Sequence, residues 1–278
     1  MAREHYENFP VASLLLPRGK RRHVAAIYAF ARQADDFADE PAHGSNRLEL
    51  LADWRLRLDR AAAGSADHPV FIALADTIGR YRLPVSLLHD LLTAFEQDVS
   101  VTSYRTFEEL LGYCRCSANP VGRLLLHLFG RADEPLLAQS DAVCTALQLA
   151  NFWQDIAIDL DKGRCYIPIE DLERFGCGAA QLALRRATPP FVEVMRHQVA
   201  RTRELFGRGA GLPAAVGGRL GFELKLVMLG GSRILDRIEQ AGYDVFHNRP
   251  TLGPPDWGRL LMRAAFLTQG GLRAALAR

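Results

Sequence analysis

Several features that mark other protein classes are missing from this sequence. It contains no run of about 18 uncharged apolar residues, which argues against a membrane-spanning helix. The segment from Met1 to Pro10 lacks the apolar stretch of a secretory signal peptide. Neither a GxxxxGK[ST] phosphate loop nor an alternation of strands with helices is present, which argues against nucleotide-binding α/β folds. We expect a cytoplasmic protein, and peripheral contact with the inner membrane stays open.

Cysteine usage and charge argue against further classes. The five cysteines are odd in number and form no CxxC pair, which disfavours a disulfide framework or a structural zinc site and fits a reducing compartment. With 34 basic and 32 acidic residues the formal net charge is +2, so nothing indicates a nucleic-acid partner. Hydrophobic residues make up 49% of the 278 residues, which is enough for a large core.

Most of the chain has the periodicity of long amphipathic helices. Local signals support their starts: an N-cap at Asn46, prolines at 69 and 84, and a capping box at Thr106 and Glu109. Only residues 165–169 look extended. The predicted helices cover residues 21–38, 47–63, 85–97, 133–161, 189–207, 220–240 and 254–276, with two more starting at 69 and 106.

Two aspartate pairs have the spacing of a metal site. Asp35 and Asp39 lie four residues apart, which puts both carboxylates on one face of a helix. Such like charges repel unless a cation lies between them, and Arg32, one turn earlier, could supply it or bind a phosphate oxygen. Asp155 and Asp159 repeat the arrangement, with Asn151 one further turn back on the same face.

The residue types in these pairs favour magnesium. Carboxylate and amide oxygens suit Mg²⁺, which takes one or two carboxylates together with substrate phosphates and water. Two pairs on facing helices would hold Mg²⁺ against a diphosphate and promote C–O ionisation. The apolar run LQLANFWQDIAIDL around the second pair means that its charges need partners. A single DxxxD is usually a solvated helix face, and spacing alone leaves that alternative open.

The residues around the pairs resemble a known family. HVAAIYAFARQADDFADE and NFWQDIAIDLDKGRCYIPIEDLERFG are similar to motifs of the squalene/phytoene synthases, and the resemblance runs over about residues 6–252. The opening ENFPVASLLLP is most like one branch, the hydroxysqualene synthases of the bacterial hopanoid pathway. The resemblance implies one all-α domain over residues 1–278, an isoprenoid-synthase-type helical bundle around a central cavity. It also implies two to three Mg²⁺ ions as cofactor and no NADPH.

The resemblance assigns roles to individual residues. Asp35 and Asp39 match the first aspartate motif, while Asp155, Asp159 and the leading Asn151 match the second. The other implied site residues are Tyr28 and Arg32, which face the diphosphate, Arg164 and Tyr166 in the closing loop, Tyr113 lining the site, and Asn8 and Phe9 capping the cavity.

Two positions depart from the family pattern. The family usually has an arginine directly before the first aspartate of the second motif, where this chain has Gln154. Losing one phosphate-facing charge fits an enzyme that ionises one diphosphate, and we retain Gln154 as a substrate-binding candidate. The turn that usually reads AGxVG in the family reads ANPVG at residues 118–122 of this chain. The amide of Asn119 in this turn could orient a catalytic water. An N-cap before Pro120 is the alternative role for Asn119.

The branch implies a specific reaction, in which presqualene diphosphate loses pyrophosphate and water captures the rearranged cation as hydroxysqualene. This would make the protein a carbon–oxygen lyase. One alternative is a squalene, phytoene or presqualene-diphosphate synthase that condenses two farnesyl-type diphosphates. A second is a non-catalytic lipid-binding partner subunit with the same fold.

The C-terminal part of the chain offers two further candidates. Arg249 lies in a segment that resembles the edge of the family's site, from where it could reach a phosphate. The last predicted helix carries Trp257, Leu260, Leu261 and Phe266 together with several arginines. Such a helix either packs on the protein's own core or lies on an anionic bilayer.

Overall fold

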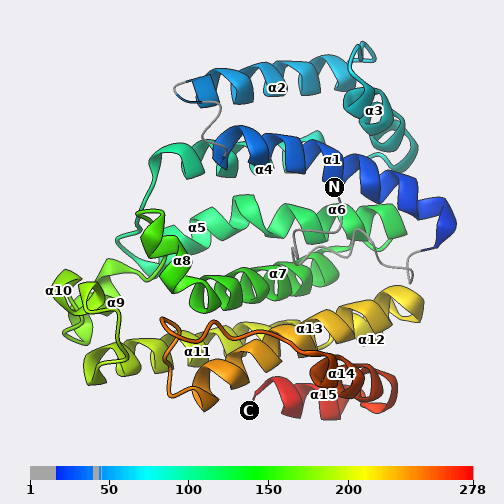
Figure 1. Cartoon of the computed structure of the whole chain (residues 1–278). Helices are drawn as coiled ribbons and strands as arrows, with labels where there is room; N and C mark the ends of the chain where they lie inside the picture. Colours follow the sequence, from blue (N-terminus) through cyan, green and yellow to red (C-terminus); the bar gives the residue numbers. More distant parts are fainter. Residues whose placement is uncertain (1–16, 40–43, 45, 278) are drawn as a thin grey trace. The chain divides into compact units, whose positions relative to one another are not determined.

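The structure is a computed structural model that describes residues 17–39, 44 and 46–277 (Figure 1). Within these residues the regular structure consists of α-helices, apart from one isolated parallel bridge between Ser103 and Cys165. The all-α prediction is therefore confirmed. The bridge lies where the sequence predicts its one extended segment.

The chain divides into two compact units. The first contains residues 1–101 and 115–137, and the second contains residues 102–114 and 138–278. One boundary lies just after α4 (Val85–Ser100), and the other two fall within α5 (Phe107–Ser117) and α7 (Glu134–Gln154). That the two units work as one domain stays a prediction.

Unit 1 is built around α1 (Arg18–Asp39). This helix contacts α2 (Arg47–Ala62), α3 (Pro69–Tyr81), α4 (Val85–Ser100) and α6 (Asn119–Phe129). An aromatic group fills the core between them: the ring centroids of Trp54 and Phe71 are 4.5 Å apart, and those of Phe30 and Phe71 are 5.9 Å apart. The buried indole of Trp54 donates to the Phe30 carbonyl at 3.2 Å, so the aromatic core leaves no polar atom of Trp54 unsatisfied.

The helix starts follow the sequence signals with small differences. Pro69 is the first residue of α3, and the imidazole of His68 accepts a hydrogen bond from the Val70 N–H at 3.3 Å. Thr106 accepts from the Glu109 N–H at 3.2 Å, as in a capping box. The Glu109 carboxylate, however, accepts from the N–H of residue 105, one position earlier than the box requires.

Unit 2 is organised around α13 (Gly218–Gln240), which contacts α11 (Pro189–Gly209), α12 (Leu212–Val216), α14 (Pro254–Phe266) and α15 (Gln269–Leu276). The remaining short helices are α8 (Ile156–Asp161), α9 (Ile169–Arg174) and α10 (Ala179–Ala183). Gly231 lets α13 pack closely against Phe206 and Leu147, because a Cβ there would lie 2.7 Å from Phe206 and 2.8 Å from Leu147.

Two segments predicted as single helices are each two helices. The segment 133–161 is interrupted at Asp155, whose φ of −105° and ψ of 12° separate α7 from α8. The segment 254–276 breaks between α14 and α15, where Leu267 and Thr268 are extended. Thr268 caps α15 by accepting from the Gly271 N–H at 3.2 Å. When a threonine side chain accepts a hydrogen bond from a nearby backbone N–H, it favours the start of a new helix at that point over an uninterrupted helix.

Among residues 17–39, 44 and 46–277, no helix is both long and apolar enough to cross a bilayer.

Candidate functional site

The first aspartate pair lies on the C-terminal turns of α1 in unit 1. Phe30, Ala34 and Ala38 are buried in the core of this unit at helical spacing, and Phe37 also packs against that core. Asp35 is half-buried, and Asp39 is exposed as the last residue of α1. Tyr28 is half-buried about two turns before Asp35.

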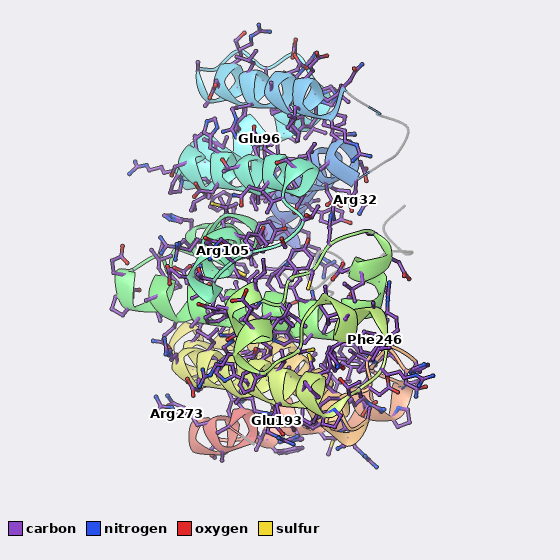
Figure 2. All side chains as sticks on the ribbon, turned by 90° about the vertical axis from the view of Figure 1, so that its left-hand side faces the viewer. Arg32, Glu96, Arg105, Glu193, Phe246 and Arg273 are labelled. Atoms are coloured by element: carbon purple, nitrogen blue, oxygen red, sulfur yellow. The ribbon has the colours of Figure 1, made fainter. Side chains whose placement is uncertain are left out.

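Arg32 is the cation beside these carboxylates. Its Nη1 lies 3.1 Å from Oδ2 of Asp35, and its Nη2 lies 2.7 Å from Oδ1 of Asp36. Figure 2 shows Arg32 labelled on this helix. Arg32 thus pairs with Asp35, one of the two predicted carboxylates, and with Asp36, while its contact with a phosphate stays a prediction. A positive charge shared by two adjacent carboxylates lowers their mutual repulsion.

The second pair lies at the junction of α7 and α8 in unit 2. Although the helix is interrupted at Asp155, the backbone hydrogen bonds of a helix continue through it. The Asp155 N–H donates to the Asn151 carbonyl at 2.9 Å, and the Asp159 N–H donates to the Asp155 carbonyl at 2.9 Å. The oxygen-bearing side chains therefore still follow one another at one-turn intervals.

Asp155 is held by an arginine from far along the chain. Nε and Nη2 of Arg249 lie 2.5 and 3.2 Å from the two carboxylate oxygens of Asp155. The hydrogen bond to Asp155 raises the pKa of the Arg249 guanidinium above its ordinary value. This is the two-pronged geometry that makes arginine–carboxylate pairs strong and directional.

Gln154 fixes the same segment of the chain. It is buried, and its side-chain amide donates a hydrogen bond to the backbone carbonyl of Pro250, which is also buried. Neighbouring residues of α7 therefore contact neighbouring residues of the 249–250 segment. Gln154 holds the backbone of this segment, while Asp155 holds its charged side chain.

The loop after α8 turns back onto the second aspartate motif. Gly163 adopts a φ of +75°, which favours glycine, and the Arg164 N–H then donates to the Asp159 carbonyl at 2.8 Å. The Cys165 N–H donates to the Thr102 carbonyl at 2.8 Å. Burial raises the pKa of the Cys165 thiol, which keeps it protonated and argues against a nucleophilic role.

An aromatic cluster lies beside this loop, formed by Tyr104, Tyr113, Phe152 and Tyr166. The rings of Phe152 and Tyr166 are stacked, with centroids 3.8 Å apart and planes 7° from parallel. Tyr113 lies 6.1 Å from Phe152 and 6.0 Å from Tyr166, and Tyr104 lies 5.6 Å from Tyr113. The faces of such rings are apolar yet carry partial negative charge, so they can stabilise a nearby cation.

The structure brings some of the predicted residues together. In unit 2, Tyr113 and Tyr166 share the aromatic cluster, Gln154 and Asp155 hold the 249–250 segment, and Arg164 folds back onto Asp159. In unit 1, Tyr28, Arg32, Asp35 and Asp39 share α1. The predictions for Asn8 and Phe9 lie outside the described residues.

Asn119 has a different helix position from the one considered in the sequence. It is buried and is the first residue of α6, whose N-cap is Ala118 and makes no side-chain cap hydrogen bond. The N-cap alternative for Asn119 is therefore wrong, because the helix begins one residue earlier than an Asn cap would require. Its proposed contact with water stays a prediction.

Sequence reasoning missed Tyr104 and Phe152 as members of the aromatic cluster, and it treated Arg249 only as a side possibility. Phe152 lies in a continuous apolar run, where nothing distinguishes a cluster member from a core residue. Tyr104 comes into place because the 102–105 segment pairs with the loop after α8, including an Ile169 N–H to Tyr104 carbonyl bond of 3.0 Å. Both depend on tertiary contacts rather than on local pattern.

The donor set of each motif fits magnesium with substrate as a further ligand. Among the described residues no group of three or more His, Cys, Asp or Glu side chains converges to hold an ion by itself. Each motif instead offers two carboxylates, and the second adds the amide of Asn151. Such oxygens are the donors that Mg²⁺ takes together with phosphates and water, and magnesium binding here stays a prediction.

Comparisons with known proteins agree with these features. A family model described as squalene/phytoene synthase matches residues 2–256. The chain belongs to the squalene/phytoene synthase family. Members of this family act on prenyl diphosphates such as farnesyl diphosphate.

Individual squalene/phytoene synthases show similarity over most of the chain. A hydroxysqualene synthase from Zymomonas mobilis is 38% identical over 226 residues, covering 80% of this chain and 75% of that protein. A phytoene synthase from Arthrospira platensis is 30% identical over 271 residues, covering 93% and 87%. The crystal structure of a squalene synthase from Alicyclobacillus acidocaldarius is 44% identical with a TM-score of 0.83, covering 87% of this chain and 91% of that one. The isoprenoid-synthase helical fold is thereby confirmed.

Proposed function

We propose that the protein is a hydroxysqualene synthase. In the reaction, the C–O bond of presqualene diphosphate breaks and pyrophosphate leaves with the bonding electrons. The cyclopropylcarbinyl cation rearranges, a water oxygen adds to it, and the added water loses a proton. One diphosphate and one water are consumed, and hydroxysqualene and pyrophosphate are formed.

The observation that carries this proposal is the environment of Gln154. Where the family usually has an arginine, this chain has a neutral side chain that is buried and donates to the Pro250 carbonyl. The remaining arginine beside Asp155 comes from position 249. One fewer positive charge at this motif supports a site for one diphosphate rather than two. The Zymomonas mobilis relative, named hydroxysqualene synthase, supports the same reading.

The residues have distinct proposed roles. Asp35 and Asp39, with Asn151, Asp155 and Asp159, would hold two to three Mg²⁺ ions, which neutralise the leaving pyrophosphate when bound. Arg32, Arg164 and Arg249 would donate hydrogen bonds to phosphate oxygens, since arginine forks match phosphate geometry.

The aromatic cluster and Asn119 would act on the cation. Tyr113, Phe152 and Tyr166 present ring faces that stabilise positive charge and are inert toward it. Asn119 would orient the water that captures the cation, because its buried amide can accept one hydrogen bond from that water. No step needs a hydride, so no NADPH is expected.

The proposal is tested by incubating the purified protein with presqualene diphosphate and Mg²⁺ in oxygen-18-labelled water. We expect hydroxysqualene whose hydroxyl carries the label, with one pyrophosphate released per alcohol. NADPH should change neither rate nor product. Squalene formed on adding NADPH would contradict the proposal.

Condensation of two prenyl diphosphates is the second candidate. The relatives named phytoene synthase and squalene synthase, which cover most of the chain, favour it. Incubation with farnesyl diphosphate as sole substrate separates the two candidates. We expect no turnover, and formation of a condensed product would replace our proposal with this one.

A non-catalytic partner subunit is the third candidate. Asp35→Ala and Asp155→Ala would each remove one carboxylate from a proposed metal motif. We expect each to lower Mg²⁺-dependent pyrophosphate release by at least about 100-fold, because metal and leaving group are stabilised together. Asp53→Ala, at an exposed carboxylate that pairs with Arg57, is the matched control and should keep full activity. Full activity in both motif variants would refute the metal assignment.

A further inference from the structure

The outer surface of α14 is apolar where a surface helix is normally polar. Asp256, Leu260 and Ala264 are buried on its inner side. On the outer side, the exposed fractions are 46% for Leu261, 61% for Met262 and 76% for Phe266. The helix therefore packs on the core of its own unit, which was one of the two alternatives considered from the sequence. It also presents a second apolar face to solvent.

The exposed charges on this helix are all positive. Arg259 and Arg263 are exposed and lie three residues before Met262 and Phe266, respectively, so they line the apolar face. The one acidic residue of α14 is Asp256, which is buried and bound by Arg233 and Arg237 of α13. No carboxylate of α14 offsets its outer arginines. We name the surface formed by Arg259, Leu261, Met262, Arg263 and Phe266 the outer α14 face.

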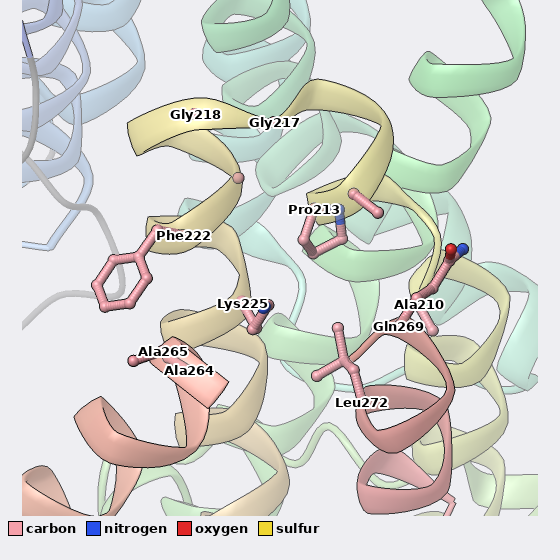
Figure 3. Close-up of a pocket in the computed structure, with 12 residues that line it drawn as sticks. Ala210, Pro213, Gly217, Gly218, Phe222, Lys225, Ala264, Ala265, Gln269 and Leu272 are labelled. Carbon is pink, nitrogen blue, oxygen red and sulfur yellow. The ribbon is translucent and has the colours of Figure 1, made fainter. Parts of the chain in front are cut away.

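A cavity of about 250 Å³ opens beside the outer α14 face, between α12, α13, α14 and α15 (Figure 3). Small and apolar side chains dominate its walls, among them Phe222, Ala264, Ala265 and Leu272. The ammonium group of Lys225 reaches into this region and donates to the Leu267 carbonyl at 3.0 Å. The apolar surface thus continues from Ala265 into the cavity. The charged side chain at the cavity, Lys225, is basic like the arginines of the outer α14 face.

We propose that the outer α14 face docks on an anionic lipid bilayer. The helix would lie in the plane of the interface, with Leu261, Met262 and Phe266 at the boundary of headgroups and acyl chains. Arg259 and Arg263 would pair with lipid phosphates. Interfacial helices combine these two features, an exposed apolar face and basic residues along it.

A second copy of the chain fits this face less well. A two-fold dimer would bring the same surface of both copies together. Arg259 and Arg263 would then meet their counterparts, and α14 has no exposed carboxylate to pair with them. An anionic lipid surface complements the charge, whereas a copy of the same face does not.

Docking of the outer α14 face does not depend on the proposed reaction. It is tested by flotation of the full chain with phosphatidylcholine vesicles that contain or lack phosphatidylglycerol. We expect the wild-type chain to float with the anionic vesicles, less so as salt rises, and weakly with the neutral ones.

Three double variants decide which residues are responsible. Met262→Ser with Phe266→Ser removes the apolar anchors, and Arg259→Gln with Arg263→Gln removes the charge. Each pair should weaken binding to anionic vesicles roughly 10-fold or more. Leu56→Ser with Ile72→Ser is the matched control, since these apolar side chains in unit 1 are 56% and 55% exposed. The control should bind as the wild type does.

The flotation and sedimentation results distinguish docking on a bilayer from formation of a dimer. Equal flotation of the wild type and both α14 variants, or no flotation of the wild type, overturns the proposal. Sedimentation equilibrium of the same proteins tests the dimer: a wild-type dimer that Met262→Ser with Phe266→Ser converts to a monomer would assign the face to a second copy. Thermal unfolding of every variant confirms that the loss of binding does not reflect misfolding.

Discussion

Two neighbouring residues at the end of α7 hold the 249–250 segment by different chemistry. Gln154 makes a buried hydrogen bond to the Pro250 backbone, and Asp155 pairs with the exposed side chain of Arg249. The first contact resembles a core interaction, because both partners are buried. The second lies at the surface, where solvent screens the pair and a ligand can exchange with it.

Gln154→Ala and Arg249→Gln should therefore fail in different ways. Gln154→Ala leaves the buried Pro250 carbonyl without its partner, which should lower the free energy of unfolding by about 1–3 kcal/mol. Arg249→Gln should change stability by less than about 1 kcal/mol and instead raise the KM for the diphosphate substrate. Denaturant titration and steady-state kinetics of both variants measure the two effects. Equal stability loss in both would show that the ion pair is structural.

At the scale of the elements, α13 and α14 are joined through one carboxylate. Asp256 is buried at the start of α14 and accepts hydrogen bonds from the Gly253 N–H and from Arg233 and Arg237 of α13. Burial alone raises the pKa of the Asp256 carboxyl, but these donors outweigh it and lower the pKa to about 2. The ionised form is therefore part of the folded state.

The contribution of Asp256 to the stability of the fold should depend on pH. Because the pKa is lower in the folded chain than the ordinary 3.8, this contribution is complete above about pH 4 and is lost as pH falls to about 2. Asp256→Asn should be less stable than the wild type at neutral pH, and the difference should shrink through this window. Comparing the two proteins at each pH cancels the other titrating groups. A constant difference would refute the assignment.

The approach of α13 to its neighbours depends on a missing side chain. Gly231→Ala would press a methyl group against Phe206 and Leu147 and should cost about 1–3 kcal/mol of stability. Gly258→Ala on α14 is the control, since nothing lies within 4 Å of its added Cβ. This control should be neutral or more stable by up to about 1 kcal/mol, because alanine favours helix more than glycine. Thermal unfolding distinguishes the two.

At the scale of the whole molecule, the two aspartate motifs belong to different units. Asp35 and Asp39 lie in unit 1, and Asp155 and Asp159 lie in unit 2. The proposed reaction needs both motifs on one diphosphate. The rate of pyrophosphate release in variants of the two motifs therefore tests whether both units act on the same diphosphate.

Combining variants from both units tests this cooperation. Removing Asp35 or Asp155 alone should abolish most of the pyrophosphate release. Removing both should be hardly worse than removing one, because groups that act as a unit are not additive. Single-turnover release of pyrophosphate measures all four proteins. Losses that multiply in the double variant would instead indicate two independent sites.

Much of the fold could be predicted from the sequence, because apolar periodicity and helix-start signals are local. Proline at 69 and threonine at 106 both lie at helix starts of the structure. The breaks at Asp155 and at Thr268 were not predicted, since apolar periodicity runs through both. At these points local hydrogen bonding and tertiary packing override the pattern.

The charged residues of the candidate site could be predicted from the sequence, but most of the contacts between them could not. The Arg32–Asp35 pair follows from helical spacing alone, one turn apart. The Arg249–Asp155 pair joins residues 94 positions apart, and the Phe152–Tyr166 stack needs the loop after α8 to fold back. Contacts of this kind arise from packing, which residue spacing does not encode.

The Arg249–Asp155 pair has a consequence for the order in which ligands arrive. A carboxylate already held by a guanidinium is a poor site for a lone cation, so Mg²⁺ alone should bind weakly at this motif. In the proposed reaction, a diphosphate that drew Arg249 to itself would release Asp155 for Mg²⁺. Cofactor and substrate would then bind with positive heterotropic cooperativity, each tightening the other by the same factor. An idle enzyme would leave the cell's free magnesium largely untouched until its lipid substrate appeared.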